Sequence, residues 1–238
     1  MSSKDAYRLR YDPIRLRTFQ ARLLRWFRRN GRDLPWRKTR DPYKILVSEV
    51  MLQQTQVDRV RGYYTRFLRK YPTVQDLAAA PPMRVRESWE GLGYYARARN
   101  LHATARAITE QHNGRFPRRL DEVMALPGVG RYTAGAVMSF AYGDPAPALD
   151  TNVRRVLTRV FVRRGAKSTA KLDRRLWALA EAVIPPKQVW AFNQAIMDFG
   201  ATVCTARNPR CGTCPMRSVC IFAERISRSN TMSAEEES

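Results

Sequence analysis

Apolar residues recur at intervals of three and four along most of this chain, the spacing that places them on one face of an α-helix. Runs in which apolar and polar residues alternate, as they do in a half-buried strand, are scarce. Local breaks such as Leu34-Pro35-Trp36, Arg40-Asp41-Pro42 and Pro127-Gly128 mark helix ends. The pattern predicts an all-α fold, with helices over residues 14–28, 43–70, 85–111 (interrupted at Gly91 and Gly93), 118–125, 134–142, 153–162 and 172–184.

The length of 238 residues suits one large or two small domains, and a hydrophobic content of 44% is ample for a packed core. The chain starts with polar and charged residues, and no segment approaches the roughly 18 consecutive apolar residues of a membrane span. We therefore expect a soluble intracellular protein without a membrane partner. Residues 227–238 are polar with an acidic run, and we expect this tail to be disordered.

The chain is strongly basic. It has 43 Lys and Arg against 21 Asp and Glu, and the formal net charge of +22 is spread along the sequence. A positive electrostatic potential of this size indicates a polyanionic partner, and nucleic acid is the first candidate. Charge alone does not separate DNA from RNA or from an anionic membrane surface.

All four cysteines fall within seventeen residues, in the arrangement Cys204-x6-Cys211-x2-Cys214-x5-Cys220. A reducing compartment disfavours structural disulfides, so four thiols this close together indicate a metal site. Zinc ribbons usually use two separated pairs, whereas here one short loop supplies every ligand, which suits a compact iron–sulfur cluster. A structural zinc knuckle is the first alternative, and a disulfide pair is the second.

In this loop the chain resembles the helix-hairpin-helix DNA glycosylases that carry a [4Fe-4S] cluster, the endonuclease III and MutY group. The resemblance covers about residues 14–222. It implies one [4Fe-4S] cluster on the four cysteines, which would order a basic loop against phosphates without a redox role. It also implies two helical subdomains flanking a DNA-binding cleft: a helical barrel with the helix-hairpin-helix over residues 35–141, and an iron–sulfur subdomain from residues 12–34 and 142–225.

Leu126-Pro127-Gly128-Val129-Gly130 lies between two expected helices. Gly128 and Gly130 allow a tight turn and bring backbone N–H groups to the start of the second helix, where they can hold a phosphate oxygen. Taken alone, the pattern is more typical of an ordinary turn between helices. The resemblance identifies it as the hairpin that grips the DNA backbone.

Asp150 stands at the start of the helix predicted after Pro147, where it can act simply as a cap. It lies twenty residues after Gly130, and the resemblance implies that it is the carboxylate that stabilises the oxocarbenium-like sugar. Tyr132 occupies the position where lyase-type members carry a lysine. A phenol cannot form a Schiff base, so we expect a monofunctional enzyme, with weak lyase activity from another amine left open.

Glu49 shares a helix face with Ile45 and Leu52, which aims its carboxyl at an apolar region. Burial favours the protonated form of a carboxylic acid and suits it to proton donation. A solvated glutamate, or one paired with an arginine, is the alternative. The stretch from Ser48 to Val57 is very similar to the segment in which MutY-type adenine glycosylases place the glutamate that protonates the purine.

The stretch from Gly91 to Leu101 is similar to a MutY-type segment whose first tyrosine wedges into the base stack, and Tyr94 takes that position. A buried core tyrosine is the alternative. By the same resemblance, further residues contact the opposite strand: Leu52, Gln53 and Gln54. Others line the pocket for the extruded base: Trp36 as an apolar wall, Arg37 as a donor, Gln194 and Asn152.

The resemblance favours a glycosylase that releases adenine opposite 8-oxoguanine or guanine. The chain ends soon after Cys220, where MutY-type enzymes normally add a domain that recognises 8-oxoguanine. Thr151 replaces the usual glycine of these enzymes, and Tyr132 also occurs in short thymine-mismatch glycosylases. The alternatives are thus a mismatch thymine or uracil glycosylase, and a non-catalytic lesion-binding or redox-responsive DNA-binding protein. We expect a monomer that binds duplex DNA with a mispair or lesion in the cytoplasm, or at the nucleoid in a prokaryote.

Overall fold

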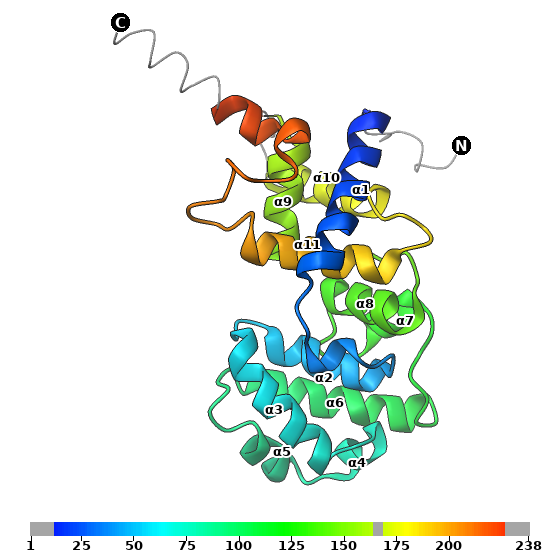
Figure 1. The fold of residues 1–238 in the computed structure, drawn as a ribbon. Coiled ribbons are helices and arrows are strands. Elements are labelled where there is room, and N and C mark those ends of the chain that lie inside the picture. Colours follow the sequence, from blue (N-terminus) through cyan, green and yellow to red (C-terminus); the bar gives the residue numbers. More distant parts are fainter. Residues whose placement is uncertain (1–11, 164–168, 227–238) are drawn as a thin grey trace, which may run out of the picture. The chain divides into compact units, whose positions relative to one another are not determined.

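The structure is a computed structural model that describes residues 12–163 and 169–226 (Figure 1). Every regular element within these ranges is helical, which confirms the predicted all-α class. None of the described helices is long and apolar enough to cross a membrane. The predicted acidic tail, residues 227–238, lies outside the described part of the chain.

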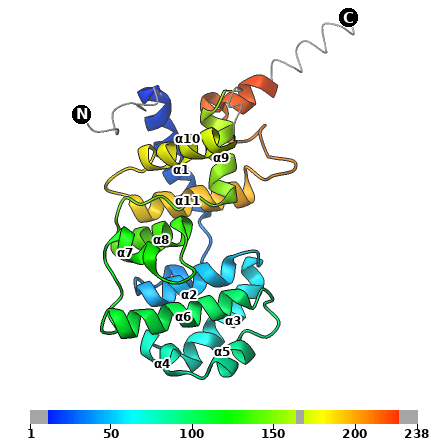
Figure 2. The same cartoon turned by 180° about the vertical axis from the view of Figure 1, so that it is seen from behind.

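Residues 33–148 form one compact unit, called here the central unit. Its longest helix, α6, packs against α4, α5 and α2, and crosses the unit between them (Figure 2). Large side chains such as Phe67, Trp89 and Leu101 fill the space around α6 and are almost fully buried. The elements of the unit are η1 (Pro35–Arg37), α2 (Pro42–Leu52), α3 (Val57–Lys70), α4 (Val74–Ala79), α5 (Pro82–Ser88), α6 (Ala96–Gln111), α7 (Leu120–Ala125), α8 (Arg131–Val137) and a π-helical turn, η2 (Met138–Tyr142).

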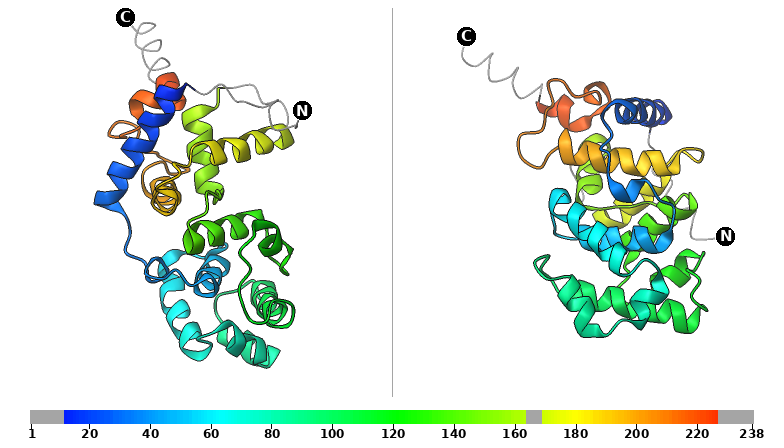
Figure 3. Two further views of the ribbon diagram at one scale, coloured as in Figure 1. Left: turned by 90° about the vertical axis from the view of Figure 1, so that its right-hand side faces the viewer. Right: turned by 60° about the horizontal axis from the view of Figure 1, so that its bottom comes forward.

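The described residues of 1–32 and 149–238 form a second compact unit, the terminal unit. Here α1 packs on α11, α11 on α9, and α9 on α10 (Figure 3). The ring of Phe19 meets those of Phe161 and Phe192 edge-on in the centre of this core. Fully buried Asp198 accepts hydrogen bonds from the backbone and side chain of Arg32 and so fixes the end of α1 to α11. The elements are α1 (Pro13–Asn30), α9 (Thr151–Phe161), α10 (Thr169–Ala182), α11 (Val189–Thr202) and η3 (Arg217–Val219).

Aspartates cap three of the helices at the positions where the sequence breaks. Asp12 and Asp41 each precede a proline at the first helical position and accept hydrogen bonds from the first-turn N–H groups of α1 and α2. Asp150 caps α9 in the same way. The side-chain oxygen satisfies a donor that the helix itself leaves unpaired, and proline at the next position has no N–H to satisfy.

The single helix predicted over residues 43–70 is wrong. The chain leaves the helix after Leu52 and enters α3 at Val57, and between them Gln54 has a left-handed backbone with φ of 55°. The turn carries no proline or glycine, so the usual marks of a helix end are missing. The tertiary contact that stabilises this turn involves Arg97.

Candidate active site

Glu49 is buried in the central unit, with 3% of its surface exposed. The Tyr132 hydroxyl donates a hydrogen bond of 2.6 Å to its Oε2. Glu49 belongs to α2 and Tyr132 to the first turn of α8, and these two helices pack against each other. The structure therefore brings together two of the three predicted catalytic side chains, and the alternative of a solvated Glu49 is wrong.

The predicted hairpin consists of α7, a tight turn and α8. Gly128 has φ of +73°, and a Cβ added there would lie 2.5 Å from Cβ of Asn100. Gly130 differs, because its φ of −87° suits any residue and no atom lies within 4 Å of an added Cβ. Thr104 fixes the turn by donating to the Pro127 carbonyl at 2.7 Å. Gly128 is thus needed by the turn itself, whereas Gly130 leaves open space beside the start of α8.

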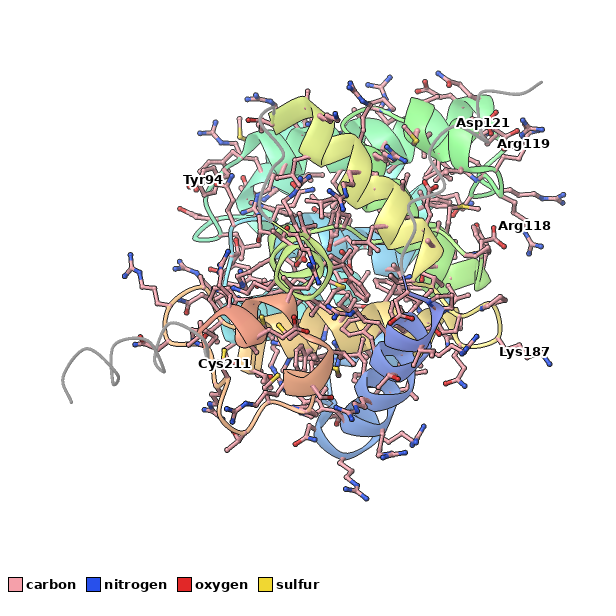
Figure 4. The ribbon with its side chains drawn as sticks, turned by 90° about the horizontal axis from the view of Figure 1, so that it is seen from above. Tyr94, Arg118, Arg119, Asp121, Lys187 and Cys211 are labelled. Carbon is pink, nitrogen blue, oxygen red and sulfur yellow. The ribbon has the colours of Figure 1, made fainter. Side chains whose placement is uncertain are left out.

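The predicted DNA-inserting residues lie in two neighbouring turns. Tyr94 is 61% exposed, has φ of 49° and is labelled in Figure 4. It is not a core tyrosine. Gln54 is exposed, Leu52 is half-buried at the end of α2, and Gln53 lies 3.5 Å from the Thr133 hydroxyl. Both Tyr94 and Gln54 thus hold a backbone conformation that is uncommon for residues other than glycine, and such strain persists only where the surroundings impose it.

The guanidinium of Arg97, a residue that no sequence motif singles out, joins these two turns. Arg97 is 8% exposed, and its Nη1 donates to the carbonyls of Val50, Met51 and Gln53 at 2.5–3.0 Å. Its Nη2 donates to the Thr55 hydroxyl and to the carbonyls of Leu92 and Gly93 at 3.1–3.2 Å. The guanidinium also lies 5.5 Å from the ring centroids of Trp89 and Tyr94.

A cation at the end of α2 binds carbonyls that have no partner within the helix and faces the negative end of the helix dipole. Burial lowers the pKa of Arg97, and Tyr94 opposes this shift electrostatically. One buried cation thus ends α2 at Leu52 and ties the turn of Gln54 to the turn of Tyr94. Helical periodicity cannot reveal this role, because a basic residue inside a helix pattern usually marks the solvent face.

Asp150 lies in the terminal unit as the cap of α9. Its Oδ1 accepts from the backbone N–H of Val153 at 2.6 Å, and its Oδ2 accepts from the Asn152 amide at 3.1 Å. Burial raises the pKa of the Asp150 carboxyl, while these hydrogen bonds act in the opposite direction. Asp150 is therefore both a cap and a largely desolvated carboxylate, so the two interpretations of this residue are compatible.

A chain of hydrogen bonds runs from Asp150 to the cysteine loop. Arg155 donates to the Asn152 side-chain oxygen at 2.7 Å, to the Gly200 carbonyl at 2.6 Å and to the Cys204 carbonyl at 2.7 Å. Asn152, predicted to line the base pocket, thus lies between Asp150 and Arg155 within the terminal unit. Arg155 was not predictable, because nothing in its local pattern distinguishes it from the other arginines of α9.

The four cysteines line one small cavity of the terminal unit (Cys211 is labelled in Figure 4). Arg159 lines it too and lies 3.4 Å from Sγ of Cys204, and the backbone N–H of Met216 lies 3.4 Å from Sγ of Cys214. Burial, with a smaller contribution from the neighbouring thiols, raises the pKa of Cys214 to about 11. Such thiols become thiolates when a positive charge lies among them.

The four cysteines, placed around one cavity, fit an iron–sulfur cluster. Within the described residues, no three His, Cys, Asp or Glu side chains lie close enough together to hold one metal ion. A four-iron cluster is larger than an ion and takes its thiolates at separate corners, so its cysteines surround a cavity without touching one another. N–H donors directed at the sulfurs are a usual feature of such sites.

The predicted base-pocket residues are distributed over both units. Trp36 is 6% exposed and packs edge-on against the ring of Tyr64 in the central unit, where Arg37 is half-buried. Gln194 is 5% exposed on α11 of the terminal unit, which also holds Asn152. The pocket that these side chains are predicted to share stays a prediction.

Comparison with known proteins gives two family matches. Residues 47–182 match the HhH-GPD superfamily of base excision DNA repair proteins. Residues 204–220 match the iron-sulfur binding domain of endonuclease III, which confirms the predicted [4Fe-4S] cluster.

Curated relatives include adenine DNA glycosylases. The human protein is 42% identical over 98% of this chain and 44% of its own length. The Mycolicibacterium smegmatis protein is 45% identical over 82% of this chain and 66% of its own length. The chain thus spans about half the length of the mammalian relatives that it matches.

Solved structures with the same fold include a thermostable thymine-DNA glycosylase, with a TM-score of 0.84 and 34% identity over 89% of this chain and 98% of the other. A trapped covalent intermediate of endonuclease III with DNA matches with a TM-score of 0.76 and 29% identity, over 91% of this chain and 99% of the other.

Proposed function

The chain belongs to the HhH-GPD superfamily of base excision DNA repair proteins, and we propose that it is a monofunctional DNA glycosylase that releases adenine mispaired with 8-oxoguanine or guanine. The observation that carries this proposal is the buried Glu49 carboxyl held by the Tyr132 hydroxyl, in a chain 42% identical to human adenine DNA glycosylase. A buried acid suits the protonation of a purine, which is a poor leaving group without a proton.

Binding begins with the backbone and then opens the base stack. Basic side chains and the hairpin at Gly128 hold the phosphates, while Tyr94 and Gln54 enter the duplex beside the mispair. An aromatic ring inserted there offsets part of the cost of unstacking the target base. The exposed side chains of these two residues, on strained turns joined by Arg97, support this role.

Glu49 then gives a proton to N7 of the extruded adenine, while the Tyr132 hydroxyl keeps its hydrogen bond to Oε2. The bond between C1′ and N9 breaks, and its electron pair leaves with the base. The ionised Asp150 stabilises the positive charge that develops on the sugar. Water adds to C1′ and releases a proton that restores Glu49, so the products are adenine and an abasic site.

The cysteines Cys204, Cys211, Cys214 and Cys220 would hold the [4Fe-4S] cluster, which supplies the positive charge and the cross-links that order their loop. Exposed arginines on this loop would then face the DNA backbone: Arg207, Arg210 and Arg217.

The test is single-turnover base release from duplexes that hold 8-oxoguanine:A, G:A, G:T or G:U, followed by alkali to reveal abasic sites. We expect adenine release from the first two, and a loss of at least about a thousandfold in Glu49→Gln. Glu87→Gln is the matched control, because Glu87 is an exposed residue of the same unit paired with Arg84. Equal rates in the two variants would contradict the role of Glu49.

A second candidate is excision of thymine or uracil. It is favoured by the similarity to the thymine-DNA glycosylase structure, which this chain covers almost completely. Release from G:T or G:U with adenine untouched would establish this candidate in place of the first. For either activity we propose a monomer that acts on duplex DNA in the cytoplasm, at the nucleoid if the source is prokaryotic.

A further inference from the structure

A second cavity lies in the central unit, between α5 and the outer face of α6. Its volume is about 560 Å³, within the range of about 300–1,000 Å³ typical of small-molecule sites. Three arginines line it: Arg86, Arg99 and Arg106. Among the described residues that line the cavity none is acidic, so the lining is positively charged, although the charge of Arg106 is partly offset by Glu110 outside it.

A buried histidine contributes an unpaired polar atom to the same cavity. His102 lines it and is 7% exposed, and its Nε2 has no hydrogen-bond partner among the described residues. Leaving a buried polar nitrogen unpaired is unfavourable, so such atoms are rare unless a ligand or water binds them. A ligand oxygen in the cavity would supply the missing partner.

Two of the three arginines are restrained before binding. The Arg86 guanidinium lies 5.3 Å from the ring centroid of Tyr95, which also lines the cavity. Arg106 is held by two hydrogen bonds to Glu110 on the next turn of α6. Arg99 is exposed, and its guanidinium has no partner within the described part of the chain. Restricting two of the three side chains before binding lowers the entropy lost when a ligand binds.

We propose that this cavity binds the phosphate group of a nucleotide. Arginines bind phosphate through paired N–H donors, and the histidine N–H adds a directed hydrogen bond. The cavity is larger than a phosphate alone requires, which leaves room for the attached sugar. The nucleotide is either free in solution or one unit of the DNA strand beyond Tyr94, since Tyr95 is the next residue. Binding to the DNA strand rests on the proposed insertion of Tyr94, whereas binding of a free nucleotide is independent of base excision.

The first experiment measures binding directly with the full cluster-loaded chain. The sequence has two histidines, so His112→Gln leaves His102 as the one histidine signal in a spectrum of protein with 15N-labelled histidine. We add either deoxyadenosine monophosphate or an undamaged duplex, with deoxyadenosine as the ligand that lacks phosphate. The His102 signal is expected to shift in a saturable way with one or both phosphate ligands and not with deoxyadenosine.

The second experiment uses matched double variants. Arg86→Gln with Arg99→Gln removes two cavity charges, and Arg69→Gln with Arg84→Gln removes two exposed charges of the same unit outside the cavity. For a DNA-derived phosphate, the slope of log affinity against log salt should fall by about 2 in the cavity pair and less in the control pair. For a free nucleotide, calorimetry should show binding of deoxyadenosine monophosphate that only the cavity pair loses.

A response to DNA alone assigns the site to the strand, a response to the mononucleotide alone assigns it to a free ligand, and either supports the proposal. It is overturned if His102 responds to neither ligand, or if the cavity pair binds both as the control pair does. Base release is a separate assay, so the failure of the proposed activity leaves this result intact.

Discussion

Replacing Arg97 by lysine keeps the charge at this site and removes the geometry that joins the two DNA-inserting turns. The guanidinium reaches six acceptors: four belong to the end of α2 and the Gln53–Thr55 turn, and two are the carbonyls of Leu92 and Gly93. An ammonium has three N–H donors on one nitrogen and cannot span both groups. At least one buried carbonyl of Val50, Met51 or Leu92 then loses its partner, which costs about 1–3 kcal/mol. We expect Arg97→Lys to lower the free energy of unfolding of the central unit by about 2 kcal/mol.

The functional effect should exceed what this loss of stability explains. Leu77→Ala is the control, because Leu77 is a fully buried residue of α4 and its truncation costs about 2–5 kcal/mol. Thermal denaturation gives the stability of both variants. Their activity is then assayed below the lower melting temperature, with the fluorescence of 2-aminopurine placed next to the mispair as the report of unstacking. Only Arg97→Lys should slow unstacking and base release, whereas Leu77→Ala should retain the wild-type rates.

Two results would refute this reasoning. If Arg97→Lys unstacks and releases the base at the wild-type rate, the two turns do not need a common cation. If both variants lose activity in proportion to their stability, Arg97 acts only through the fold.

Three further predictions concern the site and the hairpin. Tyr132→Phe removes the hydrogen bond to the Glu49 carboxyl and should slow single-turnover base release by about ten- to a hundredfold without affecting DNA affinity. An unchanged rate would show that Glu49 acts without this hydrogen bond. Burial raises the pKa of the Asp150 carboxyl, so the folded state loses stability when this group ionises as the pH rises through that pKa. Asp150→Asn should therefore melt at or above the wild-type temperature at neutral pH and still lose base release. A lower melting temperature would contradict this. Gly128→Ala should lower the melting temperature, since the left-handed backbone costs about 1–2 kcal/mol and the new methyl group meets Asn100, whereas Gly130→Ala should melt as the wild type does.

The starts of α1 and α2 were predictable because their causes are local. An aspartate followed by proline sets the first turn of α1 and of α2 with two adjacent residues, whatever the rest of the chain does. The contact between Glu49 and Tyr132 was not predictable in this way, since it depends on how α2 packs on α8. Each residue was selected separately, through resemblance, and the hydrogen bond between them became visible only in three dimensions.

The end of α2 shows why part of the site could not be predicted from the sequence. Leu52 is followed by glutamines and a threonine, none of which stops a helix strongly, and the carbonyls at this end are bound by a residue more than forty positions later. A cause so distant leaves no mark in the local pattern. The strained φ of Gln54 follows from the same contact, because a backbone held at several carbonyls has little freedom to return to a helical conformation.

The many arginines of this chain have two different roles, which the amino-acid composition does not distinguish. A net charge of +22 indicates a polyanionic partner, and exposed side chains such as Arg99 fit that interpretation. Arg97 and Arg155 instead donate hydrogen bonds to backbone carbonyls. These bonds fix the turn of Gln54 and the start of the cysteine loop. Removing an exposed arginine should therefore change the salt dependence of DNA binding and leave the fold unchanged, whereas removing one of these two should alter the geometry of a site at any salt concentration. The salt dependence of a defect thus separates the two kinds of arginine, which the sequence alone cannot do.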